Sequence, residues 1–119
     1  MNVAVLGASD KPDRYAYQAV MLLKEKGYQV FPVHPKLKMI EGLTVYSSLN
    51  DIMESVDTIS LYLGPERSNL VIDEILQKKP RRVILNPGTE NSHLKIQAIS
   101  HGIEVVEVCT LVMLKTNQF

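Results

Sequence analysis

The sequence predicts one α/β domain of the Rossmann-like, doubly wound kind, with a mainly parallel sheet of five to six strands and helices on both faces. Two observations predict it. Short apolar segments rich in β-branched residues alternate with segments of helical spacing, and a chain of 119 residues has room for one domain. With 45% hydrophobic and 22% charged residues the composition is that of a globular protein, so we expect residues 1–119 to form one domain.

The first strand and the first helix are the plainest elements of this pattern. Residues 2–6 form a short apolar run that ends at Gly7, which predicts a buried strand. Residues 14–26 carry apolar side chains at helical spacing, and Gly27 follows where a helix commonly ends. We therefore predict a strand, a tight turn and a helix in this order.

The next elements are shorter. Residues 29–33 are expected to form a second strand, which Pro35 stops. Residues 43–46 fit a short third strand, and a brief helix is expected to follow through Met53.

The second half of the chain repeats the alternation. Gly64-Pro65-Glu66 opens a helix, because proline suits the first helical position and an acidic residue suits the first turn. The apolar residues 109–114 are expected to cover the sheet of their own chain rather than a second copy. The expected elements are strand 58–63, helix 64–78, strand 82–85, helix 91–101 and strand 104–108.

Charge and composition argue against several classes of protein. The 13 basic residues balance 13 acidic ones, which argues against binding of nucleic acid by net charge. We expect no membrane association, since no run of about 18 apolar residues and no signal segment is present, and the single cysteine fits a reducing, cytoplasmic location. Residues 1–38 hold six basic and three acidic residues, which is either ordinary surface variation or an anion site in the first third.

The turn after the first strand is the first candidate site, because ligands of doubly wound sheets bind at the carboxyl ends of the strands. Gly7 permits a tight turn there. The amides of Ala8 and Ser9, with the Ser9 hydroxyl, can donate to a phosphate near the start of the following helix. The three-glycine fingerprint of dinucleotide-binding proteins is absent, since Ser9 and Pro12 stand where it needs its other glycines.

The residues after the second strand narrow the ligand class. Proteins that bind NAD usually carry an acidic residue at this place to hold the ribose hydroxyls. This chain has His34, Pro35, Lys36 and Lys38 instead, and its next carboxylate is Glu41. Unless these lysines only face solvent, they suit a nucleotide with an extra phosphate on its ribose, and both NADP and coenzyme A carry one.

Several segments together resemble the CoA-binding domain family. They include VLGAS at 5–9, YQVFPVHPK at 28–36, NPGTEN at 86–91 and VCT at 108–110. The resemblance covers nearly the whole chain in order, so it is more specific than any single motif. The family comprises small standalone proteins, mostly bacterial, that are similar in fold to the N-terminal CoA-binding domain of the succinyl-CoA synthetase α subunit.

The resemblance implies non-catalytic binding of coenzyme A, or of an acyl-CoA, in the crevice at the carboxyl ends of the strands. It also implies a role for each matching residue. The implied contacts are the phosphate turn (Gly7, Ala8, Ser9), the diphosphate (Lys11, Arg14), the adenosine (Pro32, His34, Pro35, Lys36), the 3′-phosphate (Lys36 or Lys38), the far side of the crevice (Leu63, Gly64, Pro65) and the pantetheine arm (Asn86, Pro87, Gly88).

Two other functions stay open at this stage: an NADP-binding oxidoreductase or sensor domain, and a partner subunit that completes the active site of another chain. No catalytic or metal-ligating constellation favours an enzyme, because the three histidines and Cys109 show no ligand or nucleophile spacing. The expected partners are a small nucleotide cofactor and, for the chain itself, a second copy or an unknown protein.

Overall fold

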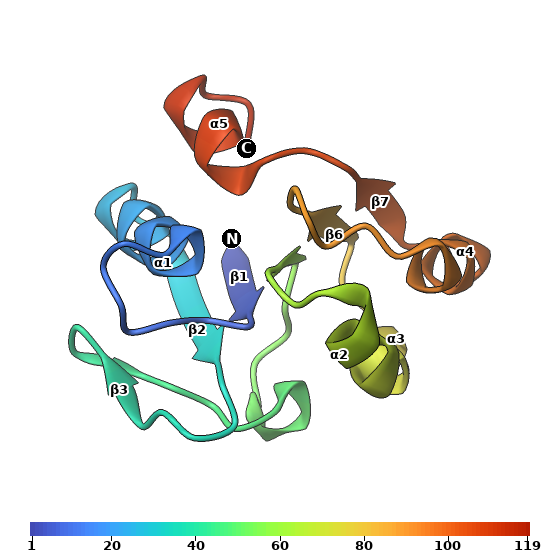
Figure 1. Cartoon of the computed structure of the whole chain (residues 1–119), viewed down its shortest axis with the longest axis horizontal. Coiled ribbons are helices and arrows are strands. Elements are labelled where there is room, and N and C mark those ends of the chain that lie inside the picture. Colours follow the sequence, from blue (N-terminus) through green and yellow to red (C-terminus); the bar gives the residue numbers. More distant parts are fainter.

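Five parallel strands form the sheet of the computed structural model, which describes residues 1–119 (Figure 1). Their order is β2-β1-β5-β6-β7, so the chain first extends the sheet on one side of β1 and then on the other. This confirms a single α/β domain with a parallel sheet. The strands are β1 (Asn2–Leu6), β2 (Gln29–Val33), β5 (Thr58–Leu61), β6 (Arg82–Leu85) and β7 (Glu104–Val106).

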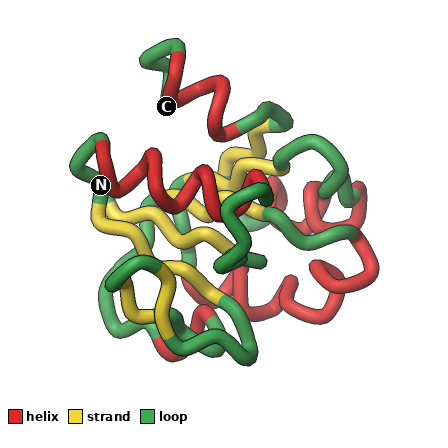
Figure 2. The backbone as a smooth tube through the Cα atoms, turned by 60° about the vertical axis from the view of Figure 1, so that its left-hand side comes forward, coloured by secondary structure: helices red, strands yellow, loops and turns green.

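Helices cover both faces of this sheet, as expected (Figures 1 and 2). Side chains alternate across β1, so Val3 and Val5 pack in a core with α1 and α5. Ala4 and Leu6 pack in the other core, with α3 and α4. The helices are α1 (Tyr15–Glu25), α2 (Pro65–Ser68), α3 (Ile72–Lys78), α4 (Ser92–Ser100) and α5 (Thr110–Lys115).

The apolar segment 109–114 covers its own sheet, as predicted. It forms most of α5, a helix that the sequence did not suggest, and buries Leu111 and Leu114. Leu114 belongs to the same core as Val20 and Leu23 of α1. No helix of the chain is both long and apolar enough to cross a bilayer.

The predicted single helix over 64–78 is wrong, because the segment breaks into α2, a 3₁₀ turn at Asn69–Val71 and α3. Asn91 packs against the break. Its side-chain nitrogen donates to Ser68 Oγ at 2.7 Å and to Asn69 Oδ1 at 2.9 Å, while its oxygen accepts from the amide of Leu94 at the start of α4. The break is thus in contact with a residue more than twenty positions away in the chain.

The predicted third strand over 43–46 is only partly right. β4 (Leu43–Thr44) pairs antiparallel with β3 (Met39–Ile40), and the two form a hairpin outside the main sheet. Glu41 and Gly42 both have positive φ, of 46° and 83°, as a two-residue hairpin turn requires. Beyond β4, Tyr46 forms one parallel bridge with Val33. The brief helix that was expected next is a 3₁₀ turn at Leu49–Asp51.

Both ends of the chain meet at the amino edge of the sheet. The Phe119 ring packs edge-on against Tyr28, with ring centroids 5.2 Å apart. The guanidinium carbon of Arg82, the first residue of β6, lies 4.5 Å from the centre of that ring, and Met1 Sδ lies 3.9 Å from its Nη2. The edge of the sheet where the strands end is therefore free of both termini.

Candidate functional site

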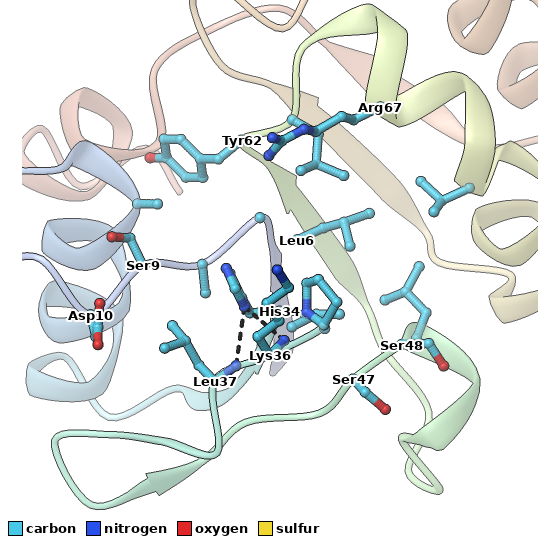
Figure 3. Close-up of a pocket in the computed structure, with 18 of the residues that line it drawn as sticks. Leu6, Ser9, Asp10, His34, Lys36, Leu37, Ser47, Ser48, Tyr62 and Arg67 are labelled. Atoms are coloured by element: carbon cyan, nitrogen blue, oxygen red, sulfur yellow. Dashed lines mark hydrogen bonds between the residues drawn. The ribbon is translucent and has the colours of Figure 1, made fainter.

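A cleft of about 910 Å³ lies at the carboxyl ends of β1, β2 and β5 (Figure 3). The strand order reverses at β1, whose neighbours are β2 and β5. Such a reversal opens a crevice above the sheet, and it is the usual binding place in folds of this kind. Three segments line the cleft: the turn after β1 with the start of α1, the loop after β2, and the residues that follow β5.

The turn after β1 forms the floor of the cleft and depends on Gly7. This residue has a φ of 90°, and its amide and that of Ala8 both donate to the carbonyl of Val33, at 3.2 and 3.1 Å. A Cβ at Gly7 would lie 2.9 Å from Leu63 Cδ2. Ser9 Oγ accepts from the amide of Lys11 at 3.1 Å, which leaves the hydroxyl proton free to bind a ligand.

The loop after β2 is held by His34. Its Nδ1 accepts hydrogen bonds from the amides of Lys36 and Leu37, at 3.0 and 3.1 Å, and its own amide donates to the carbonyl of Tyr46 at 2.9 Å. These contacts fold residues 35–37 into a turn at the cleft, where Lys36 is exposed (Figure 3).

The opposite wall comes from the residues after β5. Leu63, Leu70 and Val71 line it with Arg67, and Leu70 is 82% exposed. The break between α2 and α3 contains Leu70 and Val71. This wall is therefore mainly apolar, with one guanidinium on it.

The cleft has an excess of positive charge in a chain whose formal net charge is zero. The four basic residues that line it are Lys11, Arg14, Lys36 and Arg67, and the acidic ones are Asp10 and Glu74. The single ion pair of the structure joins Lys95 to Glu107, so all four cations lack a carboxylate partner. An anionic ligand would supply the missing partners.

Tyr62 closes the cleft toward α5 and contains an unusual buried group. Its hydroxyl oxygen is buried without a hydrogen-bond partner. Burial raises the pKa of Tyr62 to about 12, and the nearby Cys109 adds to this. The hydroxyls of Ser60 and Thr110, which bond each other at 2.7 Å, offset the rise only in part. The phenol therefore stays protonated at any physiological pH.

The structure brings nine of the sixteen expected residues together in one cleft. The expected residues that line it are Gly7, Ala8, Ser9, Lys11, Arg14, His34, Pro35, Lys36 and Leu63. Gly64 and Pro65 border a smaller hollow beside it, which shares Leu63 and Arg67 with the cleft.

The other expected residues lie outside the cleft lining. Pro32 lies in β2, and Lys38, which is exposed, accepts from the amide of Val45 through its carbonyl. Pro87 and Gly88 form an exposed turn after β6. Asn86 is 1% exposed, and its carboxamide is fully engaged with β5 and α5.

Sequence reasoning missed several residues of the cleft. Arg67 follows β5 closely, so extending the search after each strand by three residues would have found it. Nothing local signals Leu70 and Val71, because they reach the cleft through the break in the expected helix. The other missed lining residues are Asp10, Tyr15, Ala16, Leu37, Ser47, Ser48, Tyr62 and Glu74, with Leu6, Val33 and Leu49 below them.

Comparison with known proteins shows the family, since the CoA binding domain matches residues 1–115 of the 119. The chain belongs to the CoA-binding domain family. One solved structure, of an uncharacterized protein, is 40% identical to it with a TM-score of 0.92, and the match covers 99% of this chain and 97% of that one. The fold is thus shared over nearly the full length of both proteins.

Two curated relatives match over a shorter stretch. The uncharacterized protein YneT of Bacillus subtilis is 31% identical over 76 residues, which are 64% of this chain and 56% of YneT. The ADP-forming acetate–CoA ligase II subunit alpha of Pyrococcus furiosus is 36% identical over 67 residues, which are 56% of this chain and 14% of that protein. The matched stretch thus spans about half of one relative and a small part of the other.

Proposed function

We propose that this chain binds coenzyme A, free or as an acyl-CoA, in the cleft at the carboxyl ends of β1, β2 and β5, and that it catalyses no reaction by itself. The observation that carries the proposal is the set of four cations without ion pairs around one cleft. Coenzyme A brings a diphosphate and a 3′-phosphate, which are strong partners for such groups. Membership of the CoA-binding domain family supports the same ligand.

The proposed orientation follows from the order of the strands. Lys36 lies over β2 and would bind the 3′-phosphate beside the adenosine. The Ser9 hydroxyl, with Lys11 and Arg14 at the start of α1, would bind the diphosphate over β1. Because β5 lies on the other side of β1 from β2, the pantetheine arm would extend toward the wall that contains Leu63.

The volume of the cleft is compatible with this ligand. About 910 Å³ lies near the upper end of the range of about 300–1,000 Å³ that small-molecule pockets span. NADP is the competing ligand, since Lys36 would also suit a 2′-phosphate.

Calorimetric titration with CoA, dephospho-CoA, NADP and NAD tests the proposal. We expect CoA to bind most tightly and dephospho-CoA about tenfold more weakly, because an exposed charge-assisted phosphate contact contributes at the lower end of about 1.5–3 kcal/mol. Absence of CoA binding would exclude the proposed function. Tighter binding of NADP than of CoA would favour the oxidoreductase or sensor alternative.

A pair of matched variants assigns the 3′-phosphate contact. Lys36→Gln is expected to weaken CoA binding about tenfold and to abolish the preference for CoA over dephospho-CoA. Lys38→Gln, two residues further along the same loop but outside the cleft lining, is expected to leave both unchanged. If Lys38→Gln has the larger effect, the assignment of Lys36 is wrong.

A partner-subunit role is the second candidate function. It is favoured by the similarity to a stretch of the acetate–CoA ligase subunit alpha, of which this chain covers only a small part. Affinity purification of the chain from its native source tests it, and recovery of a ligase subunit in a fixed ratio would support it.

A further inference from the structure

The two ring nitrogens of His34 have different surroundings. Nδ1 lies 3.0 Å from the amide nitrogen of Lys36 and 3.1 Å from that of Leu37. Both amides can only donate, so Nδ1 must be the acceptor and has no proton. The proton of the neutral ring is therefore on Nε2, and Figure 3 shows this nitrogen turned away from the turn and toward the cleft.

We propose that His34 is the positioning residue of the turn that carries Lys36, and that it holds this turn only as the neutral Nε2–H tautomer. The side-chain acceptor replaces the carbonyl that would otherwise close such a turn, as an Asn or Asp oxygen does in an Asx-turn. The consequence for the ligand rests on the proposed function, because Lys36 is the residue assigned to the 3′-phosphate. The state of the turn itself does not depend on it.

Protonation of His34 opens the turn. An imidazolium has an N–H at both positions, so Nδ1–H would point at two amide N–H groups and both hydrogen bonds would be lost. The turn is thus compatible only with the neutral ring.

The charged groups around His34 determine how ligand affinity responds to protonation of the ring. Those that share the cleft with the ring are Asp10, Lys11 and Arg14 from the segment after β1, Lys36 on the turn itself, and Arg67 and Glu74 from the segment after β5, together with the neutral phenol of Tyr62. A further positive charge adds little attraction for phosphate in an open, solvated cleft. Displacement of Lys36 removes a direct contact, so affinity falls as the ring is protonated.

The tautomer can be read from the ligand-free protein, and His101 supplies an internal contrast. Its Nδ1 lies 2.9 Å from the carbonyl oxygen of Gln97, which can only accept, so this Nδ1 must donate. A two-bond ¹H–¹⁵N spectrum near pH 8 is therefore expected to show opposite neutral tautomers for His34 and His101. A protonated Nδ1 on His34 in that spectrum would overturn the proposal.

Two variants separate positioning from mere packing. In His34→Asn, Oδ1 stands at the same number of bonds from the backbone as Nδ1 and can accept from the same two amides, so CoA affinity is expected to stay within about threefold at pH 8. His34→Leu has no acceptor and is expected to bind about tenfold more weakly, as the loss of two amide hydrogen bonds implies. Equal binding by the Leu variant and the wild type would contradict the positioning role.

If the wild type does not bind CoA at all, the proposed function fails, while the tautomer spectrum still decides whether His34 holds the turn.

Discussion

At the scale of single residues, Gly7 is the glycine with the least space for a side chain. Its φ of 90° is unfavourable for any residue with a Cβ, and the space beside it is filled by Leu63 and by the carbonyl carbon of Tyr62, 3.1 Å from an added Cβ. The first contact is with a side chain that can shift, and the second is with the backbone of β5's continuation, which cannot. The turn after β1 therefore lies in close contact with the end of β5 at the floor of the cleft.

Gly7→Ala is therefore expected to cost about 2–4 kcal/mol in the free energy of unfolding, from backbone strain and overpacking together. Gly27→Ala is the matched control, since Gly27 has the same φ of 90° but nothing within 4 Å of an added Cβ. This control is expected to cost only the strain, about 1–2 kcal/mol. Urea denaturation of both variants measures the difference, and equal losses would show that the contact with Tyr62 is relieved without cost.

Tyr62 predicts a loss of stability at alkaline pH. Its folded-state pKa is about 12, whereas a tyrosine in the unfolded chain titrates near 10. Between these values the unfolded state loses its proton first, so the free energy of unfolding falls as the pH rises, by about 2 kcal/mol at pH 12, and this group has a negligible effect below about pH 9.

The variant Tyr62→Phe is expected to remove this alkaline loss. At neutral pH it is expected to be as stable as the wild type or about 1 kcal/mol more stable, because the buried hydroxyl has no hydrogen bond to lose. Tyr15→Phe, at a position that is 70% exposed, serves as the control and is expected to keep the wild-type profile. Thermal melts from pH 8 to 11.5 decide between these outcomes.

At the scale of elements, Asn86 joins three of them. Its side-chain nitrogen donates to Ser60 Oγ at 3.0 Å and to the carbonyl of Leu61 at 2.8 Å, both in β5. Its oxygen accepts from the amide of Thr110 at 2.8 Å, the first residue of α5. A side chain at the end of β6 thus anchors the last helix to the middle of the sheet.

Asn86→Ala is expected to destabilise the fold by about 2–4 kcal/mol, since it leaves a buried amide, hydroxyl and carbonyl without this partner. Pro87→Ala, at the exposed next position, is expected to change stability by less than about 0.5 kcal/mol. Denaturant unfolding measures both effects: the midpoint is expected to fall for Asn86→Ala and to stay the same for Pro87→Ala, while the slope of the unfolding free energy against denaturant concentration stays unchanged. CoA affinity of Asn86→Ala under folding conditions is expected to be close to wild type, and a large loss would place Asn86 among the ligand contacts.

Local pattern was enough to predict the elements whose ends are set locally. The helix expected over 91–101 is found at Ser92–Ser100, with Asn91 as its cap, and every expected strand of the main sheet except 43–46 is present. The break in 64–78 was not predicted, because no glycine or proline within residues 66–78 marks it, and its contacts with Asn91 come from far along the chain. The hairpin was missed because Glu41 takes a positive φ that its residue type does not suggest.

The residues of the candidate site also fall into two groups: those whose positions are set locally and those whose positions depend on distant parts of the chain. The rule that ligands bind where strands end was enough to find Gly7, Ser9, His34 and Lys36, whose positions depend on β1 and β2. The residues that form the wall after β5 were not predicted, because Leu70 and Val71 reach the cleft through the break in the expected helix. The role of His34 in holding the turn was also out of reach, since a sequence does not show which ring nitrogen meets which amide.

At the scale of the whole molecule, a formal net charge of zero coexists with a cleft that is lined by more basic than acidic residues. Salt screens exposed charges, with a Debye length of about 10 Å at 0.1 M and about 3 Å at 1 M. CoA affinity is therefore expected to fall about tenfold between 50 mM and 500 mM NaCl, whereas the melting temperature changes little, because the chain has a single surface ion pair. Calorimetry and thermal melts across this range test both expectations.

The salt response also has a matched pair of variants. Lys36→Gln is expected to show a shallower dependence than the wild type, and Lys38→Gln the same dependence. A CoA affinity that is independent of salt would contradict a binding mode based on the four unpaired cations.

The meeting of Met1 and Phe119 beside Arg82 has a practical consequence. Both ends emerge at the amino edge of the sheet, while the cleft opens at the carboxyl edge, so a tether at either end points away from the cleft. The chain can therefore be immobilised on a sensor surface or joined to a fluorescent reporter through either terminus while the cleft stays open to solution. Joining the two ends by a short linker and reopening the chain at the exposed hairpin tip, at Glu41–Gly42, would give a permuted form with the same cleft.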